Sequence, residues 1–130
     1  IHLAKEISKV SAKKGIITNV LLEVNVGKEE SKSGIFLEGL NELVCEVAEM
    51  ENIKIKGLMT IPPICDSEAE VSKYFESMYQ TFIDIKNKNI DNVDMDILSM
   101  GMSHDYEAAV KNGSNIVRVG SAIFGARKYF

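Results

Sequence analysis

Two short apolar runs near the end of the chain each lead into small and hydroxyl-bearing residues. The run 95–100 leads into Ser103, and the run 116–119 leads into Gly120 and Ser121. Glycines let a backbone approach a ligand closely, and a helix that begins just beyond them directs free N–H groups at an anion. The pattern predicts a phosphate site. The alternative is that these glycines only mark loops.

Two further polar residues lie within apolar runs, where burial is costly unless the side chain finds a partner. Arg118 lies in the last apolar run, and its permanently charged guanidinium needs an acceptor or a ligand there. Asn25 lies near the end of the run 20–26, where it makes either a structural hydrogen bond or a ligand contact. Lys28 and Lys32 follow in a polar loop and could bind an anion, although most loop lysines are simply solvated.

The elements that must position these residues alternate between helices and strands. Apolar residues recur at helical spacing over the segments 3–10, 36–47 and 71–85. A capping box, Ser67 with Glu70, opens the third of these helices, and Gly15 is predicted to end the first. Strands are predicted at 20–26, 53–61, 95–100 and 116–119. Such alternation indicates parallel strands joined by right-handed crossovers.

The polar residues of interest gather at the carboxyl ends of the predicted strands, where (β/α) barrels carry their sites. We therefore predict an α/β fold of the (β/α)8 TIM-barrel type. The chain would form one domain over residues 1–130 and hold about the C-terminal half of the barrel, a helix plus four parallel βα units. Because it opens at Ile1, inside a helical pattern and without methionine, we expect it to be part of something longer.

The composition narrows the classes of function. Hydrophobic residues make up 45% of the chain and charged residues 26%, with a net charge of −4, as in soluble globular proteins. The sequence has no basic stripe with interleaved aromatic residues, so nucleic-acid binding is not predicted. No apolar run has the roughly 20 residues that cross a bilayer. Cys45 and Cys65 do not form a Cys-x-x-Cys motif, so we expect reduced thiols of a cytoplasmic protein and not a disulfide or a metal pair.

Sequence motifs that are specific in combination cover the chain. They are Leu22-Glu-Val-Asn-Val26 with Lys32-Ser-Gly34, Gly57-Leu-Met-Thr60, Leu98-Ser-Met-Gly-Met-Ser-His-Asp105 and Val117-Arg-Val-Gly-Ser-Ala-Ile-Phe-Gly125. On these motifs, the chain resembles the pyridoxal phosphate homeostasis protein family over all 130 residues. Members of that family are single-domain barrels that bind pyridoxal 5'-phosphate (PLP) and are similar to the N-terminal domain of alanine racemase.

The resemblance implies PLP as the cofactor. It implies contacts from Ser103, Gly120 and Ser121 to the phosphate, from Arg118 to the pyridine nitrogen, and from Met59 and Asn25 near the ring. A cation at that nitrogen disfavours its protonation, and an unprotonated pyridine is a poor electron sink. This fits a protein that holds PLP without catalysis. The family's Schiff-base lysine ends the first strand of the barrel, upstream of this sequence.

Three hypotheses of function follow. The first is a non-catalytic, cytoplasmic PLP-binding protein of vitamin B6 homeostasis, to which this chain supplies the phosphate-binding half. The second is a fragment of a fold-type-III PLP enzyme, a racemase or decarboxylase. The third is half of an unrelated phosphate-binding barrel. The expected partners are PLP and either the missing barrel half or a second copy of the chain, with a full-length monomer or dimer.

Overall fold

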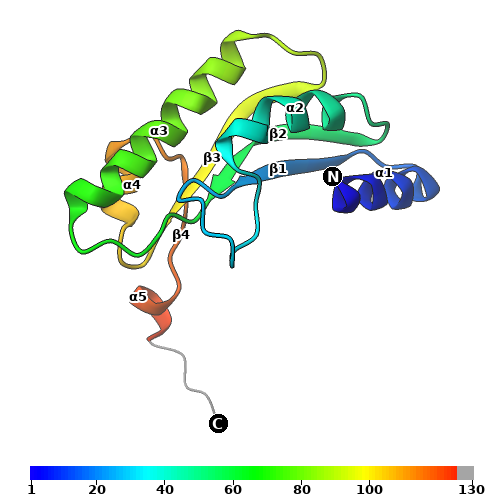
Figure 1. Ribbon diagram of the computed structural model, residues 1–130. Coiled ribbons are helices and arrows are strands. Elements are labelled where there is room, and N and C mark those ends of the chain that lie inside the picture. Colours follow the sequence, from blue (N-terminus) through cyan, green and yellow to red (C-terminus); the bar gives the residue numbers. More distant parts are fainter. Residues whose placement is uncertain (126–130) are drawn as a thin grey trace.

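Helices and strands alternate along the chain, as the spacing of the apolar residues predicts (Figure 1). The computed structural model describes residues 1–125. The helices are α1 (His2–Lys14), α2 (Leu37–Ala48), α3 (Glu68–Asn87), α4 (Tyr106–Lys111) and α5 (Ser121–Phe124). The strands are β1 (Thr18–Val24), β2 (Ile53–Thr60), β3 (Val93–Met102) and β4 (Ile116–Arg118).

The four strands form one sheet in the order β1-β2-β3-β4, and every neighbouring pair is parallel. A strand order that follows the chain is the order of consecutive strands in a (β/α) barrel. The register brings Val24 beside Thr60 and Met102 beside Arg118. The carboxyl ends of the strands therefore lie along one edge of the sheet, where the sequence predicted the site.

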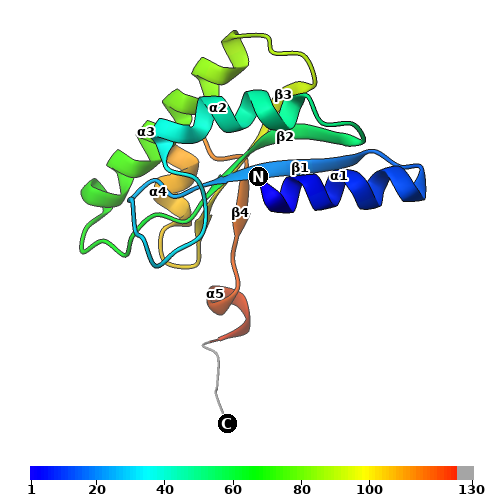
Figure 2. The same cartoon turned by 45° about the vertical axis from the view of Figure 1, so that its right-hand side comes forward.

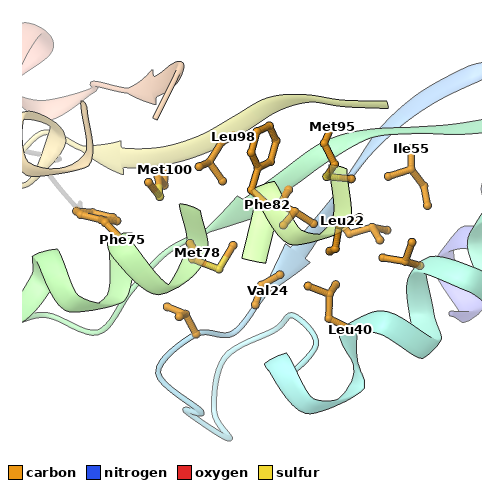
Figure 3. Packing of buried hydrophobic residues seen from close by; sticks show 14 of the residues in the cluster. Leu22, Val24, Leu40, Ile55, Phe75, Met78, Phe82, Met95, Leu98 and Met100 are labelled. Carbon is orange, nitrogen blue, oxygen red and sulfur yellow. The ribbon is translucent and has the colours of Figure 1, made fainter. Parts of the chain in front are cut away.

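One face of the sheet carries the core. In both views α2 and α3 lie over this face, with α4 next to α3, whereas α1 lies along the edge strand β1 (Figures 1 and 2). Apolar side chains of the strands pack there against those of α2 and α3 (Figure 3). The largest buried members include Leu40, Ile55, Phe75, Met78, Leu98 and Met100. The stripe predicted on the third helix is thus core packing, as expected for apolar residues at helical spacing.

Local signals set several element ends. The Ser67 hydroxyl accepts a hydrogen bond from the Glu70 N–H at 3.2 Å, so the predicted capping box does open α3. Gly15 ends α1 in the left-handed conformation with φ of 67°. The first strand ends at Val24, two residues earlier than predicted, because the Asn25 N–H donates to the Ile35 carbonyl and leaves the sheet ladder.

Candidate phosphate-binding site

The turns after β3 and β4 converge on the side chain of Ser103. Its hydroxyl oxygen accepts hydrogen bonds from the N–H of Gly120 at 3.1 Å and from the N–H of Ala122 at 3.0 Å. These three residues come from the two motifs in which the sequence placed the phosphate site. The structure therefore brings the two motifs together around one hydroxyl oxygen, which accepts from two N–H groups, and Ser121 lies between the two donors in the sequence.

Glycine at position 101 allows the strand to bring Ser103 to this point. Gly101 has a φ of +105°, a conformation that L side chains rarely adopt. A Cβ there would lie 2.7 Å from the Cβ of Ala109 on α4, so the strand end and the helix are in close contact. The turn that follows is closed by a hydrogen bond from the Asp105 N–H to the Met102 carbonyl at 3.2 Å. Ser103 lies inside this turn.

Arg118 reaches from β4 to the end of β2. Its Nη2 donates to the carbonyl oxygen of Thr60 at 2.8 Å, and its Nε is buried with no partner among residues 1–125. Burial lowers the pKa of Arg118, and the negative charges of Asp105 and Glu23 oppose that shift. The guanidinium is thus partly buried and held at the carboxyl edge of the sheet, with donor capacity to spare. The sequence flagged this residue correctly as one that needs an acceptor.

Asn25 is buried, and all its polar groups are engaged within the chain. Its side-chain amide donates to the Glu29 carbonyl at 2.6 Å, and its side-chain oxygen accepts from the Glu29 N–H at 3.0 Å. A longer bond of 3.4 Å runs to the Lys32 carbonyl. Of the two alternatives that the sequence left open, the structure shows the structural hydrogen bond: Asn25 closes the loop 27–34.

Met59 is the penultimate residue of β2 and precedes Thr60, whose carbonyl accepts from Arg118. It pairs in register with Glu23 on β1 and with Ser99 on β3. It also lines a largely apolar groove of about 740 Å³ that runs along β1 between α1 and α2. The predicted place of Met59 near a ligand ring stays a prediction.

The two loop lysines have carboxylate partners. Lys28 forms an ion pair with Glu38 at the start of α2, and Lys32 pairs with Glu29 at 2.9 Å. Each lysine is therefore paired with a carboxylate of this chain, and neither is indicated as an anion ligand. This outcome agrees with the alternative that such lysines are surface residues.

Ser103 also lines a second cavity, whose charge is unfavourable for a phosphate. It measures about 360 Å³ and lies between the start of α3 and the turn after β3. Four acidic residues are among those that line it, namely Asp66, Glu68, Asp105 and Glu107. Because like charges repel, these acidic residues disfavour an anion in this cavity.

Three contributors to the site were missed at the sequence level. They are the N–H of Ala122, the carbonyl of Thr60, and Ser114, whose hydroxyl donates to the Met100 carbonyl at 2.7 Å and ties β4 to β3. Backbone groups carry no residue-type signal, so the first two could not have been found from the sequence. A serine just before a short strand is a weak signal for the third.

Other kinds of site are not indicated within residues 1–125. No group of three or more His, Cys, Asp or Glu side chains there could hold a metal ion. Cys45 and Cys65 are both free thiols. No helix in the described part of the chain combines the length and apolar character needed to cross a membrane.

Comparison with known proteins decides the family. Residues 1–128 match the family described as "Alanine racemase, N-terminal domain". The chain belongs to this family. It is 44% identical over 128 residues to the pyridoxal phosphate homeostasis protein of Aquifex aeolicus. The matched region covers 98% of this chain and 55% of that relative. It is also 44% identical over 111 residues to the protein of the same name from Escherichia coli K12, covering 85% of the chain and 46% of the relative.

Solved structures of this fold agree with that assignment. A structure described as an unknown protein from Bifidobacterium adolescentis superposes with a TM-score of 0.89 at 37% identity, over 95% of this chain and 49% of that one. PipY of Synechococcus elongatus, solved with PLP bound, superposes with a TM-score of 0.82 at 25% identity, over 95% of this chain and 57% of PipY.

The predicted resemblance and the predicted (β/α)-barrel type of fold are therefore confirmed for this member of the alanine racemase N-terminal domain family. The chain spans about half the length of the curated relatives it matches.

Proposed function

We propose that this chain carries the phosphate-binding half of a PLP site in a protein that holds the cofactor without turnover. One observation carries the proposal: the Ser103 hydroxyl meets the N–H groups of Gly120 and Ala122, beside the partly buried Arg118. The names of the relatives support it, since these are called pyridoxal phosphate homeostasis proteins. PipY, which has the same fold, has been solved with PLP bound.

The residues present fit a phosphorylated pyridine in two respects. The space where a Cβ of Gly120 would stand is open, with no atom within 4 Å, so an anion can approach the backbone there. The buried Nε of Arg118 has no partner among the described residues and can donate to a ligand atom. An unpaired buried donor is costly, so a ligand acceptor would offset that cost.

Each residue then has a definite task. Ser103, Gly120 and Ser121 would bind the phosphate through hydroxyl and N–H groups. Hydrogen bonds from such groups to charged oxygens are shorter and stronger than those to neutral oxygens. Arg118 would face the pyridine nitrogen and keep it unprotonated through its own positive charge. PLP supplies electron-sink chemistry when bound, and an unprotonated ring weakens it. Asn25 and Met59 would lie near the ring. Asn25 also holds the loop 27–34 in place through its bonds to Glu29.

The role of the whole protein is part of the proposal. We place it in PLP homeostasis, as a binding protein of the cytoplasm and not an enzyme, with PLP as its ligand. The alternative is a fold-type-III PLP enzyme such as a racemase or decarboxylase. Assays of the full-length protein with common amino acids separate the two, since sustained racemisation or decarboxylation would exclude a pure carrier.

The open edges of the sheet suggest what completes it. Within residues 1–125, β1 pairs with the strand β2 and, at its carboxyl end, forms one isolated bridge with Ile35, whereas β4 pairs with β3. The rest of the outer edge of β1 and the outer edge of β4 are unpaired in this part of the chain. Unpaired edges recruit further strands. We propose that these edges are covered by the remaining barrel strands or by a second copy of the chain.

The test of the site compares PLP with pyridoxal, which lacks the phosphate. In the full-length protein, Ser103→Ala should weaken PLP binding about 10- to 100-fold, the usual cost of a hydrogen bond to a charged group, and leave pyridoxal binding nearly unchanged. Ser72→Ala, on α3 and outside the two turns that meet at Ser103, is the matched control. Equal losses for both ligands, or no loss for PLP, would overturn the proposed phosphate site.

A further inference from the structure

Asp105 makes hydrogen bonds that helix capping does not explain. It is the N-cap residue of α4, yet its side chain makes no capping hydrogen bond. Instead its Oδ1 accepts from the N–H of Met102 at 2.7 Å. Its own N–H donates to the Met102 carbonyl at 3.2 Å. Asp105 therefore closes the turn 102–105 twice, once through its backbone and once through its carboxylate.

This double closure determines where Ser103 lies. Ser103 is the residue after Met102 in the closed turn, and its hydroxyl reaches the N–H groups of Gly120 and Ala122 at 3.1 and 3.0 Å. A shift of the turn by about 1 Å would break such contacts, since hydrogen bonds weaken steeply with distance and angle. The hydrogen bond from Met102 to the Asp105 carboxylate thus helps to set the position of Ser103 relative to the N–H groups of Gly120 and Ala122.

The side chain of Asp105 is also well enclosed. Only 9% of it is exposed, and its second oxygen, Oδ2, lies 3.6 Å from Nε2 of His104. Met102 stands beside Arg118 in the register of β3 and β4. One oxygen of the Asp105 carboxylate is therefore engaged by the N–H of Met102, the residue that pairs with Arg118 in the sheet.

We propose that Asp105 is a positioning residue for phosphate binding, which acts through Ser103 by holding the turn 102–105 closed. This inference rests on the proposed function and names a residue that it did not include. Asp105 touches no ligand; it sets the direction of the hydroxyl that does.

The experiment is a double-mutant cycle in the full-length protein, read as the ratio of pyridoxal to PLP dissociation constants. This ratio isolates the phosphate contribution from general losses of binding or folding. Ser103→Ala and Asp105→Ala should each lower it about 10- to 100-fold. The double variant Ser103→Ala/Asp105→Ala should fall no further than the larger single loss, because two residues that act through one contact are not additive.

Two conservative variants test the same step even where Asp105→Ala fails to fold. Asp105→Asn keeps an oxygen that can accept from Met102, so the ratio should stay within about threefold of the unmodified protein. Asp105→Glu keeps the charge but displaces the oxygen by one methylene, so the ratio should fall at least about tenfold. A role through charge alone would give the reverse order.

The outcomes separate this inference from the proposed function. If Ser103→Ala lowers the ratio and Asp105→Ala or Asp105→Glu does not, the positioning role is overturned and the phosphate site stands. If the losses of the double variant multiply, Asp105 does not act through Ser103, and the inference also fails. If Ser103→Ala itself leaves the ratio unchanged, the phosphate site fails and takes the inference with it.

Discussion

At the carboxyl edge of the sheet, the hydrogen bonding and the space around single residues depend on their neighbours. Arg118 donates to the Thr60 carbonyl and keeps an unpartnered Nε, while burial lowers its pKa. Gly101 and Gly120 differ sharply in their surroundings, because a Cβ would collide with α4 at the first and meet open space at the second. These contrasts allow predictions that separate stability from binding.

Arg118→Ala in the full-length protein should change the absorbance spectrum of bound PLP more than it weakens PLP binding. Removing the cation would let the ring nitrogen take up a proton, and the ring absorbs differently in its two protonation states. Arg118→Lys, which keeps a charge without the planar fork, serves as the comparison. A spectrum that stays the same in Arg118→Ala would mean that the guanidinium does not face the ring nitrogen.

Gly101→Ala should destabilise the fold by about 1–3 kcal/mol or more, because it combines a strained φ with a close contact. Thermal unfolding of residues 1–130 or of the full-length protein measures this. Gly120→Ala is the matched variant: with a φ of −112° and open space, it should change stability by no more than about 0.5 kcal/mol. Equal destabilisation by both would contradict the packing of β3 against α4.

At the scale of elements, β2 and β3 are joined by charged side chains as well as by the backbone ladder. Lys54 and Lys56 both approach Asp94, at 3.0 and 3.2 Å, and Lys56 also approaches Asp96 at 3.3 Å. Hydrogen bonds donated by Lys54 and then by Lys56 lower the pKa of Asp94, and the hydrogen bonds that Lys56 donates to Asp94 and Asp96 raise the pKa of Lys56. This cluster lies at the amino-terminal part of the strands, away from the phosphate site.

Asp94→Asn should flatten the dependence of stability on acid pH. A carboxyl whose folded pKa is lowered stabilises the fold above its usual value of 3.8, and the stabilisation is lost as pH falls through the lowered folded value. The melting temperature measured between about pH 7 and about pH 2 should therefore fall less steeply in the variant, most clearly at low salt. Asp91→Asn, on the exposed loop before β3, is the control, and an unchanged acid slope in Asp94→Asn would contradict the role of the cluster.

The whole molecule is an open sheet with one well-covered face. Its core lies between the strands and α2, α3 and α4, while the free edge of β1 borders an apolar groove of about 740 Å³. Parallel sheets usually have both faces covered. The chain therefore has surface that a further part of a barrel, or another molecule, would bury.

Residues 1–130 expressed alone should associate with themselves at micromolar concentrations. The outer edges of β1 and β4, of which only the end of β1 is bridged by Ile35, and an apolar groove favour contacts between copies. Sedimentation or gel filtration should show a dimer or larger species, and adding the N-terminal part of a related barrel should compete with this association. A monomer with a sharp, cooperative thermal transition would show instead that the open sheet is stable by itself.

Much of the fold was predictable because it depends on local chemistry. Helical spacing found α2 and α3, the Ser67 capping box found the start of α3, and Gly15 marked the end of α1. Strand ends were less certain: β1 stops at Val24 because the backbone after it pairs with Ile35, a contact that no residue type announces. The convergence of the turns at Ser103 and Gly120 was predicted, since carboxyl ends of parallel strands share one edge.

The sequence by itself determined the alternating α/β architecture, the apolar core face and the residues at the carboxyl edge, because periodicity and capping act over a few residues. Only the tertiary structure decided which partner each polar group takes. Asn25 bonds its own loop, whereas Arg118 reaches a carbonyl 58 residues away. Distances between remote backbone atoms set these choices, and such distances exist only once the strands are packed side by side.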